Sequence, residues 1–164
     1  MASSTCGKTM AYDLEQTVGR MFYVLNLIAG KYARRILGPY DVSREQLFCL
    51  GTLITSGDGI SQAELAQRLY VDKSSVARML VVLEQKGLVR REPVPGNLRA
   101  NTILLTDKAP VLWDSIMCHV WGWEEILLDG FSQLEVRNLI TILQRMETNA
   151  TEAQKNRASI KIKT

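Results

Sequence analysis

Apolar residues recur at steps of three and four along most of the chain, which is the spacing of one face of an α-helix. The first such stripe predicts a helix over residues 12–37, ended by Gly38-Pro39; its members are Leu14, Val18, Met21, Phe22, Leu25, Ile28, Tyr32 and Ile36. The last stripe predicts a closing helix that carries Leu134, Leu139, Ile142, Leu143 and Met146. Between them, shorter stripes alternate with turn-forming residues, so we expect a mainly helical chain.

Polar residues at the expected helix starts sharpen these boundaries. A capping box pairs a Ser with Glu or Gln three residues later, and such pairs stand at Ser43 and Gln46, Ser61 and Glu64, and Ser132 and Glu135. We expect Asp72 to cap a helix that runs through Lys86 and closes at Gly87, and Thr106 to cap one that continues to Leu128. The polar and basic end from residue 156 is expected to fray.

A β-hairpin is predicted directly after the helix over residues 73–86. Residues 88–92 and 100–105 have the composition of short strands, and residues 93–97 between them are rich in turn formers. The preceding two helices are joined by residues 70–72 alone, which is the sequence form of a helix-turn-helix. Together these elements predict a helix-turn-helix with an attached hairpin.

The second helix of this pair has two different faces. At 100° per residue, Val76, Leu80 and Leu83 fall on one side and Ser74, Arg78, Val81 and Gln85 fall on the other. Arg can donate twice to guanine, Ser can bond a base or a phosphate, and Val can contact a thymine methyl, so the outward face suits a DNA groove. A solvated surface helix is the alternative for such a helix taken alone. The order of elements between residues 61 and 105 favours DNA binding.

The distribution of charge along the chain supports DNA binding, whereas the net charge does not. The net charge of +3 is too small to indicate a nucleic-acid partner, but residues 73–99 hold six Lys or Arg against two Glu. Arg90, Arg91 and Arg99 lie on or near the hairpin, where they could reach phosphates or the minor groove. Taken singly, each is more often a surface charge.

Other classes of protein find little support. The 164 residues, 46% of them hydrophobic, suit one domain with a genuine core, and no apolar run approaches the ~18 residues of a membrane span. The start does not resemble a secretory signal, so a cytoplasmic protein is expected. No phosphate-binding glycine loop, nucleophile motif or metal set is present, and the single His119 has no obvious partner. We therefore expect no enzyme, no cofactor and no metal.

The cysteines do not form a disulfide framework. Cys6, Cys49 and Cys118 are odd in number and far apart, so reduced thiols are expected. Cys49 and Cys118 are predicted on buried helix faces, and Cys6 lies ahead of the first helix.

At this point the sequence resembles the MarR (multiple antibiotic resistance regulator) family. The resemblance spans residues 12–148 and rests on successive segments: Val42-Ser43-Arg44-Glu45-Gln46, Ser61-Gln62-Ala63-Glu64-Leu65-Ala66, Val71-Asp72-Lys73-Ser74-Ser75-Val76, Leu83-Glu84-Gln85-Lys86-Gly87-Leu88-Val89 and Leu105-Thr106-Asp107-Lys108-Ala109. It implies a fold that is mainly α with a small β-hairpin wing, in which a winged helix-turn-helix lobe adjoins a helical dimerisation region.

The resemblance also implies an organisation and a set of contacts. Residues 1–164 would form a single domain, with the lobe over 43–108 and dimerisation helices over 12–37 and 109–150. The resemblance places Ser74, Ser75 and Arg78 at base-reading positions and Arg99 at the tip of the wing. The predicted DNA contacts are therefore Lys73, Ser74, Ser75 and Arg78 on the helix and Arg90, Arg91 and Arg99 on the wing. The chain departs from the family at Asn97, where an Asp is common, and at Tyr70, where Gly is common.

The function implied is that of a sequence-specific, double-stranded DNA-binding transcriptional regulator. It would bind a palindromic operator as a homodimer and act as a repressor released by a small amphipathic or phenolic effector. Pocket residues suggested for the effector are Met21, Tyr40, Leu47 and Trp113, although ordinary core packing is an alternative for each. Two further alternatives are a winged-helix module that binds protein without specific DNA binding and a redox-responsive regulator.

Overall fold

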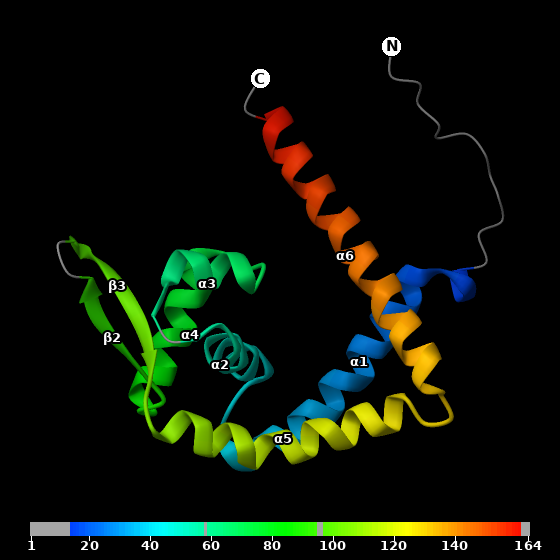
Figure 1. The fold of residues 1–164 in the computed structure, drawn as a ribbon, viewed down its shortest axis with the longest axis horizontal. Coiled ribbons are helices and arrows are strands. Elements are labelled where there is room, and N and C mark those ends of the chain that lie inside the picture. Colours follow the sequence, from blue (N-terminus) through cyan, green and yellow to red (C-terminus); the bar gives the residue numbers. More distant parts are fainter. Residues whose placement is uncertain (1–13, 58, 95–96, 162–164) are drawn as a thin grey trace. The chain divides into compact units, whose positions relative to one another are not determined.

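Six helices, two short 3-10 turns and a three-stranded sheet make up the described part of the chain (Figure 1). The computed structural model describes residues 14–57, 59–94 and 97–161, with side chains for all of these except residues 14, 97–100 and 157–161. The elements are η1 (Leu14–Gln16), α1 (Val18–Leu37), η2 (Gly38–Tyr40), α2 (Arg44–Ser56), β1 (Ile60–Ser61), α3 (Gln62–Arg68), α4 (Lys73–Gln85), β2 (Val89–Val94), β3 (Asn97–Leu105), α5 (Lys108–Leu127) and α6 (Gln133–Lys161). The prediction of a mainly helical chain with a small hairpin is confirmed.

The chain divides into two compact units, residues 1–120 and 121–164, and α5 contributes to both. In the described ranges, no helix combines the length and the apolarity that crossing a membrane requires.

Hydroxyl caps set the starts of the first two long helices. The Thr17 hydroxyl accepts from the backbone N–H of Arg20 at 3.2 Å, so α1 begins at Val18 and η1 precedes it. The expected helix over residues 12–37 is therefore confirmed over residues 18–37 and wrong over residues 14–17, where a 3-10 turn and the cap precede α1. Residues 12 and 13 lie outside the described residues. The capping box of Ser43 and Gln46 at the start of α2 is confirmed, with bonds of 3.2 and 3.1 Å.

The capping box at α3 is only half formed. Ser61 accepts from the backbone N–H of Glu64 at 3.1 Å, as predicted. The Glu64 carboxylate instead pairs with Arg68 one turn further on, at 2.8 Å. An ion pair along the helix has replaced the expected return bond to the Ser61 backbone.

Helices α3 and α4 end in the same hydrogen-bonding motif, with different residues at its critical position. After α3, Tyr70 N–H donates to the Gln67 carbonyl and Val71 N–H to the Ala66 carbonyl, at 3.3 and 3.1 Å; this is a Schellman motif. After α4, Gly87 N–H and Leu88 N–H make the equivalent bonds, at 2.8 and 2.9 Å. The motif needs a left-handed residue, which is Gly87 (φ 66°) after α4 but Tyr70 (φ 55°) after α3.

The three strands form one antiparallel sheet in the order β1-β3-β2. The hairpin strands are longer than predicted, because residues 93, 94 and 97 join the ladder that was expected to end at residue 92. Pro93 is tolerated because β2 is an edge strand of this sheet, and the register shifts between Pro93 and Val94. The two-residue strand β1, where Ile60 pairs with Ile103, was not predicted. Figure 1 shows the hairpin extending past the helices as a wing.

The core of the first unit lies between α2, α3, α4 and the sheet. Its buried side chains are Cys49, Leu50, Leu53, Ile60, Leu65, Ala66, Val76, Leu80, Leu83, Leu88, Val89, Ile103 and Ala109. The indole of Trp113 packs on this core from α5 and lies directly over Gly51 of α2. A Cβ at position 51 would stand 2.6 Å from Cη2 of Trp113, so only glycine permits this approach of the two helices.

Thr106 joins the sheet to α4 instead of capping α5 as predicted. Its hydroxyl donates to the Gly87 carbonyl at 2.6 Å, and its backbone N–H donates to the Leu88 carbonyl at 3.0 Å. The Gly87 carbonyl, which follows α4, thus takes the hydroxyl that the sequence assigns to α5. Both ends of the hairpin are thereby tied to the end of α4.

The second unit consists of the end of α5 and the long helix α6. Its capping box is confirmed: Ser132 N–H donates to the Glu135 carboxylate at 2.8 Å, and Glu135 N–H donates to the Ser132 hydroxyl at 3.3 Å. The hydroxyl and backbone bonds from Ser132 lower the pKa of Glu135. The expected fraying from residue 156 is wrong as far as Lys161, where α6 ends. The Arg, Ala and Lys residues of this stretch favour helix.

The shared motif at the ends of α3 and α4 predicts opposite responses to substitution. A left-handed backbone costs an ordinary L-residue about 1–2 kcal/mol, part of which glycine loses again as entropy. Tyr70→Gly should therefore raise the free energy of unfolding by up to about 1 kcal/mol, measured by urea denaturation. Gly87→Ala is the matched control and should lower it by about 1 kcal/mol. Destabilisation by Tyr70→Gly would mean that contacts of the Tyr70 ring outweigh the backbone strain.

Candidate nucleic-acid interface

The helix α4 presents one face to the core and the other to solvent, as its sequence predicts. Val76, Leu80 and Leu83 are fully buried. On the opposite side the exposed residues are Ser74, Arg78, Val81 and Gln85. The outward face is therefore a row of short polar and apolar side chains around one long cation.

Hydrogen bonds join the first turn of α4 to that cation. Asp72 caps the helix by accepting from the backbone N–H of Ser75 at 2.8 Å. Its two carboxylate oxygens also accept from the hydroxyls of Ser74 (2.5 Å) and Ser75 (2.7 Å). The guanidinium of Arg78 donates to the same two hydroxyl oxygens, at 3.3 and 2.9 Å. A carboxylate, two hydroxyls and a guanidinium thus form one network on the exposed face.

This network changes the chemistry of its members. Donation from the Ser74 hydroxyl, and then from that of Ser75, holds the pKa of Asp72 well below its usual range, so the carboxylate is ionised. Each serine has given its only hydroxyl proton to Asp72 and offers only lone pairs outward. Sequence reasoning identified Asp72 as a cap and missed its second role, although the carboxylate and both hydroxyls lie within four consecutive residues.

The neighbouring helix braces the start of α4. The Gln62 side-chain amide donates to the Lys73 carbonyl at 3.0 Å, which links the first turns of α3 and α4. Lys73 itself is exposed at the first position of α4. The four predicted DNA contacts on α4 therefore lie together within about one and a half turns of the helix; they are Lys73, Ser74, Ser75 and Arg78.

The three predicted wing cations differ in their surroundings. Arg90 is exposed and pairs with Glu92 on the same strand, with 2.9 Å between Nε and Oε1. Arg91 is more buried and reaches back to α4, where its Nη2 lies 3.1 Å from Oε2 of Glu84. Arg91 therefore connects the wing to α4. Arg99 belongs to β3, and its side chain lies outside the described residues.

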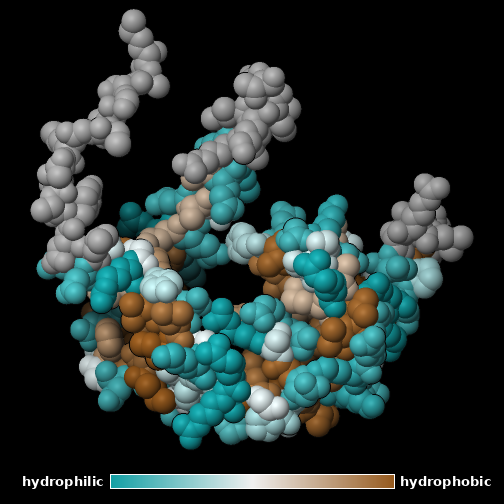
Figure 2. Space-filling view, turned by 180° about the vertical axis from the view of Figure 1, so that it is seen from behind, coloured by the Kyte–Doolittle hydropathy of each residue, from teal (hydrophilic) through white to brown (hydrophobic). Residues whose placement is uncertain are grey.

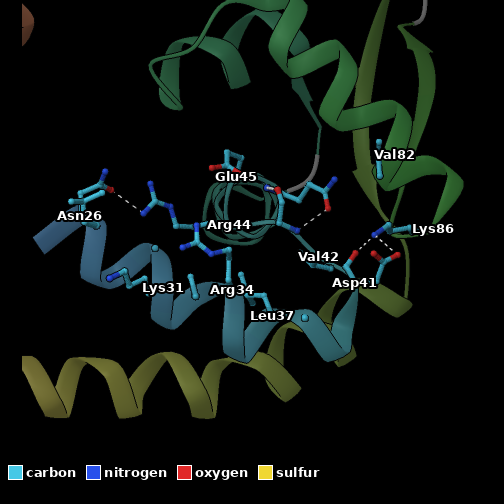
Figure 3. Close-up of a pocket in the computed structure, with 16 residues that line it drawn as sticks. Asn26, Lys31, Arg34, Leu37, Asp41, Val42, Arg44, Glu45, Val82 and Lys86 are labelled. Atoms are coloured by element: carbon cyan, nitrogen blue, oxygen red, sulfur yellow. Dashed lines mark hydrogen bonds and ion pairs between the residues drawn. The ribbon is translucent and has the colours of Figure 1, made fainter. Parts of the chain in front are cut away.

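A cavity of about 810 Å³ lies where α1, the α1–α2 connection and the end of α4 meet (Figure 3). Its lining carries four cations, Lys31, Arg34, Arg44 and Lys86, against two carboxylates, Asp41 and Glu45. Its remaining lining is apolar or small, and includes Leu27, Ala33, Leu37, Val42 and Val82.

Two of the four cations in this cavity have bonding partners there. Lys86 donates to the Asp41 backbone carbonyl and lies 2.9 Å from the Asp41 carboxylate, and Arg44 donates to the Asn26 amide oxygen at 2.9 Å. Figure 3 shows Arg34 rising from α1 toward Arg44 at the start of α2. Over the described residues, no ion pair neutralises Arg34 or Lys31.

The residues suggested for an effector are not gathered around this cavity. Among the residues described, Met21, Tyr40, Leu47 and Trp113 line neither it nor a second cavity of about 630 Å³ between α2 and α4. Met21 is exposed on α1, and Leu47 is half-buried in α2. The Tyr40 hydroxyl donates to the Ser115 carbonyl at 3.0 Å, and Trp113 packs over Gly51. Tyr40 and Trp113 thus pack the first half of α5 within the first unit.

The cysteines lie in contrasting surroundings. Cys49 is fully buried, and desolvation raises the pKa of its thiol to about 12, so it remains protonated. Cys118 is exposed on α5, so the prediction that it is buried is wrong: the inward positions Leu112, Trp113, Ile116, Met117 and Val120 fall on the opposite face of the helix. Cys6 lies outside the described residues. Within the described ranges, no cluster of three or more His, Cys, Asp or Glu could hold a metal ion.

Comparisons with known proteins identify relatives of this arrangement. The MarR family matches residues 40–100, which include α2, α3, α4 and β2. The chain is similar to the crystal structure of a MarR transcriptional regulator from Methanosarcina mazei Go1, with 27% identity and a TM-score of 0.75 over 82% of this chain and 96% of that one.

Two further similar structures were determined with DNA. The S. aureus MepR–DNA complex has 25% identity and a TM-score of 0.74, over 81% of this chain and 98% of that one. A cysteine-to-serine variant of E. coli MarR complexed with operator DNA has 26% identity and a TM-score of 0.70, over 78% and 91% of the two chains.

Proposed function

This chain belongs to the MarR family of transcriptional regulators, and on that premise we propose that it binds a palindromic operator as a homodimer and represses transcription until a small anionic effector releases it. The exposed polar face of α4 beside the wing is the observation that carries the proposal. Membership of a family of regulators also argues that the chain is not an enzyme.

The proposed reading helix is α4, seated in the major groove. Arg78 is the long donor of its outer face and can bond guanine twice, while Val81 can contact a thymine methyl. Arg90 and Arg99 belong to the wing strands and are proposed to reach phosphates or the adjacent minor groove. Arg91, paired with Glu84 of α4, would set the angle of the wing against the reading helix.

Loss of Arg78 should damage sequence reading specifically. Arg78→Ala is expected to weaken binding to the preferred duplex by about 1–3 kcal/mol and to relax base preference at one position of each half-site. The measurement is fluorescence anisotropy at several salt concentrations, with the duplex that the parent selects from a random library. Arg20→Ala, which removes an exposed arginine of α1, is the control and should bind like the parent.

The same experiment separates DNA binding from protein binding. Phosphate contacts make the affinity for DNA fall steeply with salt. If the parent selects no sequence and shows no salt-dependent affinity for any duplex, the winged-helix lobe is a protein-interaction module and the proposed function is wrong.

Dimerisation is proposed from apolar side chains that each unit leaves exposed. On α1 these include Val18, Met21, Phe22, Leu25 and Ile28, and on α6 they include Leu134, Leu139, Ile140, Ile142 and Leu143. Figure 2 shows apolar side chains gathered into patches on the surface instead of scattered singly. Patches of this kind are typical of protein interfaces.

Sedimentation at micromolar protein concentration should therefore give a mass twice that of one chain. Ile142→Glu places a charge in the α6 stripe and should shift the protein toward monomer, because burying an unpaired carboxylate in an interface is costly. Thr148→Glu adds the same charge at an exposed position of α6 beyond the apolar stripe and should remain dimeric. A parent protein that is monomeric at this concentration would contradict the proposal.

The effector site is proposed in the cavity between α1, α2 and α4. Its two cations without ion-pair partners, Arg34 and Lys31, favour an anion, and its apolar lining favours a small hydrophobic body. Val82 and Lys86 of α4 line the same cavity, so an occupant that displaces them also displaces the reading helix. A small aromatic carboxylate has this chemistry and is consistent with an amphipathic or phenolic effector.

Charge discrimination tests this site without knowledge of the natural effector. 4-Hydroxybenzoate should bind at least about tenfold more tightly than its neutral amide, 4-hydroxybenzamide, because an ionic hydrogen bond is lost in the amide. It should also release the selected duplex in the anisotropy assay. Arg34→Met should abolish the preference, whereas Arg35→Met, at the neighbouring exposed position outside the cavity, should keep it. Equal binding of acid and amide by the parent would contradict an anion site.

A further inference from the structure

We propose that Asp72 is a specificity-determining residue, which acts by holding Arg78 in a fixed orientation through the hydroxyls of Ser74 and Ser75. The inference rests on the proposed DNA-binding function and concerns the same face of α4. It assigns to a helix cap a part in sequence recognition.

The direction of each hydrogen bond supports this role. Both serine hydroxyls donate to Asp72, so both oxygens are left to accept, and both accept from Arg78. A serine that donates to Asp72 cannot donate to a phosphate at the same time, because it has one hydroxyl proton. Ser74 and Ser75 are therefore positioning residues for Arg78 and not phosphate donors.

The network orients the Arg78 guanidinium and leaves some of its N–H donors available. One N–H of each terminal nitrogen is bonded to a serine, and the second N–H of each remains available for a base. Arg78 is exposed, and an arginine on a helix surface otherwise has many rotamers to lose when it binds. Because the serines already orient the guanidinium before DNA binds, less rotamer entropy is lost when it binds a base in that orientation.

Charge gives a second, independent argument. Asp72 is an exposed carboxylate on the face that would meet a polyanion, so by itself it weakens the affinity for every duplex. Capping alone does not require that charge, because Asn and Ser cap helices about as well as Asp. A carboxylate, however, can accept from both hydroxyls and the backbone N–H together, as Asp72 does.

The decisive variant is Asp72→Asn, which keeps the cap acceptor and the shape but replaces one acceptor oxygen by a donor. We expect its affinity for a scrambled duplex to rise, because a negative charge is gone. The affinity ratio between the selected and scrambled duplexes should fall about tenfold, with base preference relaxed at the position that Arg78→Ala affects. Ser75→Ala should change the ratio in the same direction as Asp72→Asn.

Two further variants test whether Asp72 acts through Arg78 or only through the stability of the fold. Ser61→Ala removes the cap of α3 and should lower the melting temperature without changing the ratio, since the Ser61 hydroxyl has no bond to Arg78. In an Arg78→Ala background, Asp72→Asn should change the ratio less than about twofold, because the two residues act as a unit.

The outcomes that overturn the inference are distinct from failure of the proposed function. An equal gain of affinity for both duplexes on Asp72→Asn would mean that Asp72 acts only as a repulsive charge. If Asp72→Asn lowers the affinity ratio as much in the Arg78→Ala background as in the parent, Asp72 acts independently of Arg78. A parent protein that selects no duplex would overturn the proposed function, and this inference with it.

Discussion

Burial of three branched side chains on α4 determines how the rest of the first unit is presented. Val76, Leu80 and Leu83 are inaccessible to solvent and share the core with α2, α3 and the sheet. Rotating α4 about its axis would expose these groups, each of which contributes about 1.5–3 kcal/mol through burial. The outward direction of Ser74, Arg78 and the residues that follow is therefore fixed by packing on the opposite side. The proposed reading face is rigid because the face behind it is apolar.

The connections around α4 extend this constraint to its neighbours. Gln62 bonds its first turn to α3, and Glu84 holds Arg91 of the wing. Thr106 ties the hairpin to the carbonyls of Gly87 and Leu88, which follow the helix. At its end, Lys86 clamps Asp41, whose left-handed backbone (φ 52°) turns the chain between α1 and α2. A displacement at the cavity beside Lys86 would therefore be felt along the whole helix, which is how one small ligand could alter a distant reading face.

Local features of the sequence predicted the fold well, and contacts between distant segments accounted for most of the differences. The caps at Ser43, Asp72 and Ser132 depend on residues three apart, so the sequence displays them directly. The strand β1 depends on Ile60 meeting Ile103, and the extended hairpin depends on Pro93 lying at a sheet edge. The cavity is lined by residues from 26–46 and by residues 82 and 86, and no local sequence pattern predicts that these segments come together. The amphipathic division of α4, by contrast, follows from its periodicity alone.

The contact between Gly51 and Trp113 has a consequence for how relatives of this chain can diverge. The missing side chain at position 51 is the space that the indole occupies, so the two positions share one volume. Any lineage that gains a methyl group at position 51 must shrink the ring at position 113 or move α5 outward, and either change alone leaves an overlap or a void. Across homologous sequences, the sizes of these two residues should therefore vary inversely, although 61 positions separate them in the chain.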